Sequence, residues 1–294
     1  MMSYLCTKEW TEPKLTRILV PLQGFPAEVD HIQLAFNLAE KSKAKVSLLH
    51  CRERIRRSKM TLVNRLFKYA KSLSKSMKVP FEEERVTRVR ASDAILSSSQ
   101  EKDCDMIIMS IAQTQADKRL LGSTARRVAR KSKIPVLIVT SWIDDFEANY
   151  RANLKKILVP IRNTRKDQVA LRLAASLKGS SAAANAELIA LNVTSLPQVM
   201  NSTPLGTPEL KVQRELFTDD VSIFSEQTGL TLTPEHLGAR NVGEAALKFA
   251  EKEKVDLIIL GAHRKPGRIG LFLGSVSQVI ATKSSRPVVI PFLS

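Results

Sequence analysis

Long apolar runs and paired cysteines are both missing from this 294-residue sequence. No apolar run approaches the ~18 residues of a membrane-spanning helix, and the opening MMSYLCTKEW lacks the charged and then apolar pattern of a secretory signal. We therefore expect a cytoplasmic protein. The three cysteines, Cys6, Cys51 and Cys104, lie far apart with no CxxC pair, which argues against a disulfide framework or a cysteine metal site. We expect reduced, buried thiols.

Acidic residues are also in short supply. There are 29 of them against 46 Lys and Arg, so the formal net charge is +17. The excess is densest from Lys41 to Pro80, where 13 basic residues face one acid, Glu53. Such a segment suits an acidic partner or an anionic membrane surface, although a plain solvated helix face is the simpler interpretation. Nucleic acid is disfavoured, because aromatic residues make up only 5% of the chain and no RNA- or DNA-reading motif is present.

An internal repeat divides the sequence into two. Four landmarks recur in order: Ile18-Leu19-Val20-Pro21 at 157–160, Asp105-Met106-Ile107-Ile108 at 256–259, Gly122-Ser123 at 274–275, and Pro135-Val136 at 287–288. Together with the length, this predicts two domains, 1–141 and 154–294, joined by a linker at 142–153. The second copy is longer, and we place its extra residues in a Ser-, Thr-, Pro- and Gly-rich loop from Thr194 to Glu209.

Strand and helix patterns alternate within each copy. After the first strand, helical periodicity appears in both copies, followed by short apolar runs at Val46–His50 and Leu188–Val193. The basic segment 60–77 has an apolar stripe at three- and four-residue spacing, so we expect a helix whose charges face water. Further strands at Phe81–Val89 and Leu230–Glu235, helices at Ala91–Glu101 and Val242–Glu253, the Asp-x-Ile-Ile strand, a helix opening at Gly-Ser and a last strand complete each copy. This alternation predicts an α/β fold with a parallel sheet and helices on both faces.

An open parallel sheet binds ligands at the carboxyl ends of its strands, where the strand order reverses. In the second copy a loop that begins at Gly261 and ends at Gly274-Ser275 should line that edge. Gly261 allows a close backbone turn, and the residues at 274 and 275 offer unpaired N–H groups at a helix start. Arg264, Lys265 and Arg268 add positive charge, so the loop suits a phosphate group.

At these residues the chain resembles the universal stress protein family in its tandem two-domain form, over nearly its whole length. Nucleotide-binding members of that family have Gly-x2-Gly-x9-Gly-Ser/Thr after the fourth strand, and Gly261, Gly274 and Ser275 fall in register with it. The resemblance implies two doubly wound domains of the Rossmann-like, adenine nucleotide alpha hydrolase-like type. Each would hold a five-stranded parallel sheet of order 3-2-1-4-5, and the two would pair through their last strands as an internal pseudo-dimer.

The resemblance also implies a set of ligand contacts. The family's first strand typically ends Ile-Leu-Val-Pro-x-Asp, which residues 157–161 match up to the last place. Val193, at the end of the second strand, would lie beside adenine, and Val276 and Ser277 would continue the phosphate cradle. The candidate binding residues are Pro160, Ile161, Arg162, Val193, Gly261, His263, Arg264, Gly274, Ser275, Val276 and Ser277.

Two departures from the family pattern replace small or acidic residues by arginine. Arg264 stands for the second glycine, and Arg162 stands for the aspartate linked to metal and ribose contacts. Because magnesium prefers carboxylate and phosphate oxygens, metal dependence is doubtful, and the arginines favour a phosphate bound without metal. In the first copy Gln23, Ser110 and Gln113 replace the matching aspartate and glycines, so we expect a weak or lost site there.

The resemblance implies a binding protein in stress response or ligand-responsive regulation. Its ligand would be an adenine nucleotide, ATP or AMP, or another phosphate-bearing molecule in the second domain. We do not expect an enzyme, beyond slow incidental ATP hydrolysis. No His, Cys and acid cluster has metal-ligand spacing, and His31 and His50 are expected to be structural. The alternative is an interaction module or transporter-associated regulatory protein that docks its basic face on a membrane protein or anionic surface. A further homodimer is left open.

Overall fold

The computed structural model describes residues 15–25, 28–52, 60–112, 122–141, 154–162, 167–196, 208–261 and 275–292. The linker expected at 142–153 lies outside these ranges. The first repeat comprises β1 (Arg17–Leu22), α1 (Glu28–Ser42), β2 (Lys45–Arg52), α2 (Met60–Met77), β3 (Phe81–Thr87), α3 (Ala91–Glu101), β4 (Met106–Ala112), α4 (Ser123–Lys131) and β5 (Val136–Ser141). The second comprises β6 (Lys156–Pro160), α5 (Asp167–Lys178), β7 (Glu187–Ser195), α6 (Pro208–Thr228), β8 (Thr233–Ala239), α7 (Val242–Lys252), β9 (Leu257–Ile259), α8 (Ser275–Lys283) and β10 (Val288–Phe292).

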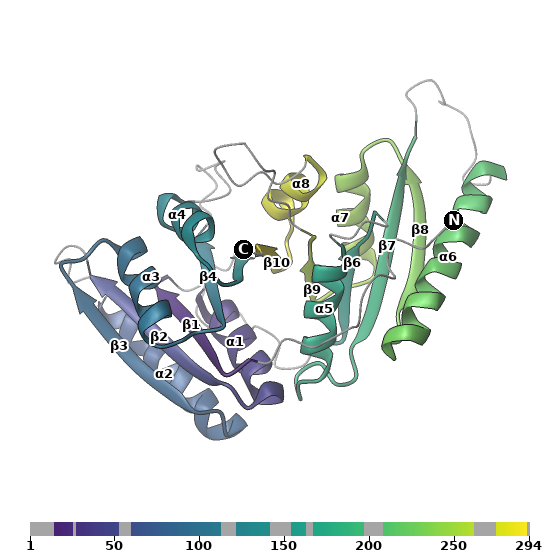
Figure 1. The fold of residues 1–294 in the computed structure, drawn as a ribbon. Helices are drawn as coiled ribbons and strands as arrows, with labels where there is room; N and C mark the ends of the chain where they lie inside the picture. The colour runs from purple at the N-terminus through teal and green to yellow at the C-terminus, as the bar shows by residue number, and fades with distance from the viewer. Residues whose placement is uncertain are drawn as a thin grey trace.

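All ten strands form one sheet in the order β3-β2-β1-β4-β5-β10-β9-β6-β7-β8 (Figure 1). Strands β1 to β5 make a parallel first half-sheet, and β6 to β10 make a parallel second half-sheet. The halves join through antiparallel pairing of β5 with β10, in which Val288 lies opposite Thr140 and Ile290 opposite Ile138. Each half has the order 3-2-1-4-5, so the expected α/β fold and the pairing through the last strands are confirmed.

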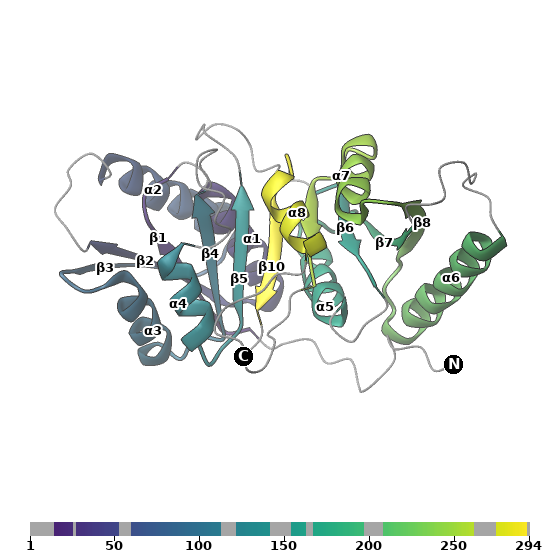
Figure 2. The ribbon, with the colours of Figure 1, turned by 90° about the horizontal axis from the view of Figure 1, so that it is seen from above.

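Helices cover both faces of this sheet, as Figure 2 shows from above. Apolar residues of α1, α2, α5 and α6 pack in one core, and those of α3, α4, α7 and α8 pack in the other. Both cores include strand residues from the two half-sheets. Across the junction, the Glu40 carboxylate on α1 accepts the backbone N–H of Ser181 at 2.9 Å and its hydroxyl at 2.6 Å. The two repeats therefore share their hydrophobic cores as well as the sheet.

The repeated aspartate of the Asp-x-Ile-Ile strands ties each half-sheet together at the edge where its strands begin. Oδ2 of Asp105 accepts the backbone N–H of Thr16 at 2.6 Å and of Arg17 at 2.8 Å. Oδ2 of Asp256 accepts those of Lys155 at 2.7 Å and Lys156 at 3.0 Å. Burial acts to raise the pKa of Asp105, but the hydrogen bonds from residues 16 and 17 outweigh it and lower that pKa. This aspartate is thus a structural repeat feature.

Helix α2 has the predicted bounds and the predicted orientation. Val63, Leu66, Phe67 and Ala70 are buried, and the lysines of the helix are exposed. Burying each large apolar side chain contributes roughly 1.5–3 kcal/mol, which fixes this face of the helix inward. The charges of the basic segment in α2 therefore face solvent.

Several details differ from the sequence expectations, and one is the end of β3, at Thr87 rather than Val89. Strand β7 continues through Thr194 and Ser195, which pair with β8, and α6 already begins at Pro208, so the expected loop Thr194–Glu209 is too long at both ends. Strand β8 begins at Thr233 rather than Leu230, because Gly229 at φ +68° ends α6 and turns the chain first. Cys104 is buried as expected, but Cys51 is partly exposed.

Within the described part of the chain, no helix is long and apolar enough to span a membrane. Its His, Cys, Asp and Glu residues likewise form no group of three placed to hold a metal ion.

Candidate functional site

The strand order reverses between β6 and β9, and the candidate residues at the ends of β6, β7 and β9 meet there. Leu158 lies opposite Ile258, so continuing the register brings Ile161 level with Gly261 just beyond the strand ends. Pro160, the last residue of β6, pairs with Leu191 of β7. Val193 lies two residues beyond Leu191, past the end of β6. The strand ends thus bring residues 160–162, Val193 and Gly261 to one edge of the sheet.

The turn after β6 is held in place from both sides. The Ile161 N–H donates to the Leu191 carbonyl at 2.8 Å, and its own carbonyl accepts from Nδ2 of Asn192 at 2.9 Å. The next residue, Arg162, donates its backbone N–H to Oδ2 of Asp167 at 3.0 Å, at the start of α5. Ile161 is buried and Arg162 is exposed. The fixed turn therefore presents a solvent-exposed guanidinium at the switch point.

Helix α8 supplies the second part of the candidate site. It begins at Ser275, which is exposed, and Val276 and Ser277 follow in its first turn. The first N–H groups of a helix have no partner within the helix and favour anions. Position 243 on α7 sets how closely α8 can approach: a Cβ added to Gly243 would lie 2.9 Å from the Val279 side chain.

His263, Arg264 and Gly274 lie outside the described residues, as do Lys265 and Arg268. The structure therefore describes the two ends of the predicted phosphate loop, at Gly261 and Ser275, and the predicted contacts of the residues between them stay predictions.

In the first domain, the equivalent turn contains a carboxylate of the chain itself. Oε1 of Glu28 accepts the Gln23 N–H at 2.7 Å, and Oε2 accepts those of Gly24 at 2.7 Å and Phe25 at 3.1 Å. Glu28 is completely buried, and this burial raises its pKa to about 7, although these hydrogen bonds act to lower it. Three N–H groups that a bound anion would use are therefore already occupied.

Residues from two neighbouring strands and from α1 close this turn further. The Ser110 hydroxyl, at the place of the family's first glycine, lies 3.5 Å from Oε1 of Glu28. Nε2 of His31 lies 3.3 Å from the Pro21 carbonyl, and Nδ1 of His50 lies 3.1 Å from that of Leu22. Burial lowers the pKa of both histidines, that of His31 to about 3. Both rings therefore stay neutral and hold the turn, in keeping with the structural role expected for them; Gln113 lies outside the described residues.

Glu28 and Asp167 are repeat-related residues that sequence reasoning missed. Each follows the proline of the Ile-Leu-Val-Pro run by seven residues and accepts backbone N–H groups of the turn after the first strand. His50 and Asn192 are related in the same way, since each bonds the carbonyl of the residue after that proline. The acidic residue that recurs seven positions after this proline in both repeats is the sequence signal that could have identified them.

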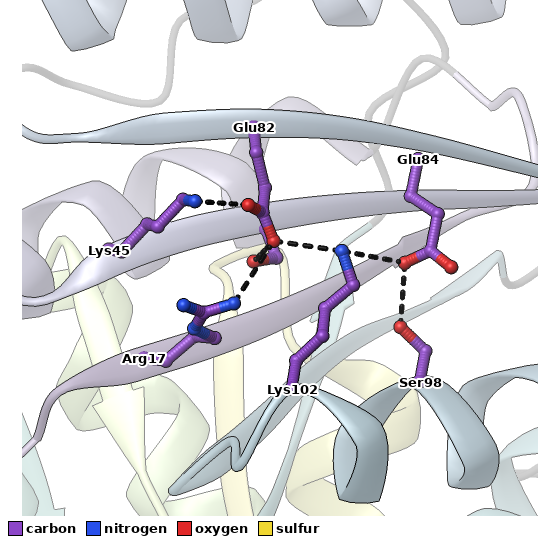
Figure 3. Close-up of polar contacts among 7 residues, drawn as sticks. Arg17, Lys45, Glu82, Glu84, Ser98 and Lys102 are labelled. Carbon is purple, nitrogen blue, oxygen red and sulfur yellow. Dashed lines mark hydrogen bonds and ion pairs between the residues drawn. The ribbon is translucent and has the colours of Figure 1, made fainter.

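Among the described residues, the densest ionic cluster lies at the opposite edge of the first half-sheet, near the strand starts (Figure 3). Glu82 contacts Lys45, Arg17 at 3.3 Å and Lys102 at 2.9 Å, and accepts the Ser47 hydroxyl at 2.6 Å. Lys102 also reaches Glu84 at 3.2 Å. Burial acts to raise the pKa of Glu82, but hydrogen bonds from Lys45, Ser47 and Lys102 lower it to about 2. This cluster ties β1, β2, β3 and the end of α3 together, away from the carboxyl ends of the strands.

Comparison with known proteins identifies the class of fold. The model of the universal stress protein family matches residues 14–140 and again 153–290. The chain therefore belongs to this family, in its tandem form.

Curated relatives and solved structures are similar over different lengths. Universal stress protein MJ0577 of Methanocaldococcus jannaschii is 43% identical over 47 residues, 16% of this chain and 29% of that protein. Universal stress protein MJ0531 of the same organism is 28% identical over 141 residues, 46% of this chain and 81% of that protein.

Among structures, a putative universal stress protein from Pseudomonas aeruginosa has a TM-score of 0.60 at 16% identity, covering 94% of this chain and 92% of that one. The cytoplasmic domain of a prokaryotic cation chloride cotransporter has a TM-score of 0.56 at 13% identity, covering 95% of each chain. At these identities the likeness shows the fold alone.

Proposed function

We propose that the chain binds an adenine nucleotide, ATP or AMP, or another phosphate-bearing ligand at the carboxyl edge of the second half-sheet, and acts in stress response or ligand-responsive regulation. The observation that carries the proposal is the meeting of Arg162, Val193 and Gly261 at the switch point. Parallel sheets of this kind bind ligands in the crevice outside that point.

The chemistry of these residues fits a phosphate next to an apolar group. The exposed Arg162 guanidinium pairs with phosphate oxygens through a planar set of N–H donors. The first turn of α8, from Ser275, offers backbone N–H groups and the positive end of a helix dipole. Val193 is partly buried against the core and exposes an apolar surface for a base.

The proposed site binds its ligand without a metal ion and without a chemical step. A cation at position 162 repels magnesium, whereas the carboxylate that it replaces would attract it. The arginine neutralises phosphate charge directly, so affinity should survive the removal of divalent ions. We propose no turnover of ATP beyond slow incidental hydrolysis.

A thermal melt tests this directly. The protein is heated with ATP, ADP, AMP or cyclic nucleotides, each with magnesium or with EDTA, and with sulfate at matched ionic strength. A ligand at about 100 times its dissociation constant stabilises the fold by ~2.7 kcal/mol, which raises the midpoint by roughly 5–10 °C. A nucleotide-specific rise that survives EDTA supports the proposal, and no rise, or an equal rise with sulfate, overturns it.

Two matched variants locate the site. Ser275→Asp puts a carboxylate at the start of α8, where it suits the helix dipole but repels phosphate, so the fold should persist and the nucleotide response should disappear. Ser123→Asp makes the same change at the exposed start of α4 in the first domain. The response should survive there, because Glu28 already fills the adjoining turn. An equal loss of the nucleotide-dependent rise in melting midpoint in both variants would contradict the assignment of the binding site to the second domain.

A second candidate function is docking on a membrane protein or anionic surface, and the exposed basic face of α2 favours it. This helix has four basic residues and no acidic one. The fold is also that of a cotransporter's cytoplasmic domain. Docking predicts salt-sensitive cosedimentation with anionic vesicles, weakened in Lys68→Glu/Lys71→Glu and absent with neutral vesicles. Salt-independent binding would count against it.

A further inference from the structure

Helix α6 has an unusual outer face. Its inner face buries Phe217, Val221 and Phe224, yet three large apolar residues point away from that core. Val212 is 52% exposed, Leu216 57% and Ile223 41%. With the exposed Asp219 and Glu226 they recur at four- and three-residue intervals, which places all five on one face of the helix. We call Val212, Leu216, Asp219, Ile223 and Glu226 the α6 stripe.

The second helix of the other repeat carries the opposite charge. Lys68, Lys71 and Lys75 of α2 are exposed and follow the same three- and four-residue spacing. We call these lysines the α2 stripe. Counted over whole helices, α2 has four basic and no acidic residues, whereas α6 has five acidic and two basic ones. Repeat-related helices thus carry complementary charge, four positive against a net three negative.

The two stripes lie at opposite ends of the molecule. Helix α2 packs on α1 and β3, at one end of the ten-stranded sheet, and α6 packs on β7 and β8, at the other (Figure 1). The helices of one chain therefore cannot pair with each other, although the helices of two chains can.

We propose that a second copy of this chain is the partner of the α6 stripe, which binds the α2 stripe of that copy in a head-to-tail contact. The aliphatic stems of the lysines cover Val212, Leu216 and Ile223, and their ammonium groups reach Asp219 and Glu226. An α6-to-α6 contact would instead place acidic residues against acidic residues. This inference is independent of ligand binding in the second domain.

Because the contact joins two different surfaces, each bound copy still offers one free α2 stripe and one free α6 stripe. Such a heterologous contact closes into a ring or grows into an open filament, rather than stopping at a dimer. The net charge of +17 on every chain opposes association at low salt. At about 0.15 M ionic strength the Debye length is ~8 Å, so repulsion between distant parts is screened while the charges in contact still attract.

Sedimentation velocity over a wide range of protein concentration, at physiological ionic strength and without nucleotide, tests the contact. The wild-type mass should rise with concentration past that of a dimer. Leu216→Asn/Ile223→Asn removes the apolar part of the α6 stripe, and Lys71→Glu/Lys75→Glu reverses the α2 stripe. Each variant should remain monomeric, because each keeps only one of the two surfaces.

The conservative changes Leu216→Met/Ile223→Met and Lys71→Arg/Lys75→Arg are the matched controls, and they should assemble like the wild type. An equimolar mixture of the two disrupted variants should form a dimer and nothing larger, since the intact α2 stripe of one binds the intact α6 stripe of the other. All substituted positions are exposed, and a melting curve for each variant checks its fold. A monomeric wild type at every concentration, or assembly that persists in Lys71→Glu/Lys75→Glu, would overturn the proposal.

Discussion

Glu28 accepts the backbone N–H of Gly24 at 2.7 Å, and this bond is the centre of a turn that closes over a completely buried carboxyl group. Two further N–H groups, of Gln23 and Phe25, converge on the same carboxylate. In the second domain the shorter Asp167 accepts the Arg162 N–H at the matching turn. The first domain thus satisfies with its own glutamate the donors that a phosphate-binding turn would offer to a ligand.

Glu28 should make stability decline as the pH rises towards neutrality. Its pKa is about 7 in the folded chain and about 4.3 in an unfolded one, so the folded state binds the proton more tightly. Stability is therefore greatest below pH ~4.3, falls up to pH ~7 by about 4 kcal/mol, and is constant above that. Denaturant unfolding of wild type and Glu28→Gln from pH 4 to 8 measures this, and a stability difference independent of pH would refute the assignment.

His31 should act in the opposite direction. Burial lowers its pKa to about 3, so the folded chain keeps it neutral while the unfolded chain protonates it below pH ~6.5. Stability should fall as the pH drops from about 6.5 towards 3. His31→Gln keeps a donor for the Pro21 carbonyl but does not titrate. The difference in free energy of unfolding between wild type and variant, measured by denaturant unfolding, should therefore narrow in acid. A constant gap would show that another group causes the acid sensitivity.

Some features of this structure were predictable from local sequence and others were not. The Ile-Leu-Val-Pro and Asp-x-Ile-Ile runs marked buried strands in both repeats, and the apolar spacing of α2 gave its bounds. Helix α6 escaped detection because Val212, Leu216 and Ile223 add apolar residues to its outer face and blur the amphipathic pattern.

The role of Glu28 could not be predicted from sequence, because it depends on the backbone path of the turn after β1. An acid in the first turn of a helix is common, since it suits the helix dipole. Only the folded turn shows that three N–H groups converge on this one. The candidate residues at the ends of β6 and β9 were easier to place, because strand ends meet at a sheet edge in any fold of this order.

Removing the charge of Glu82 should destabilise the first half-sheet. Glu82→Gln loses charged contacts with Arg17, Lys45 and Lys102, at a cost of about 1–3 kcal/mol at pH 7. Glu83→Gln is the control, because its contact with Arg85 is 3.8 Å long and exposed, and its loss should cost less than ~0.5 kcal/mol. The pKa of Glu82 is lowered to about 2, so its stabilisation is present above pH ~4.3 and disappears as the pH falls towards 2. Equal effects of both substitutions would contradict a special role for the cluster.

Gly243→Ala should disturb the candidate site from a distance. The added Cβ would lie 2.9 Å from the Val279 side chain and 3.4 Å from the Val276 carbonyl, so α8 must shift. Overpacking of this kind lowers the free energy of unfolding by about 1–3 kcal/mol. The higher helix propensity of alanine offsets up to ~1 kcal/mol of that loss. Because Val276 belongs to the first turn of α8, the nucleotide-dependent rise in the melting midpoint should shrink as well. Gly179→Ala is the control, since the three atoms nearest to its Cβ would all belong to the far end of the flexible Lys41 side chain. A variant that lost stability yet kept the full nucleotide response would show that the first turn of α8 does not contact the ligand.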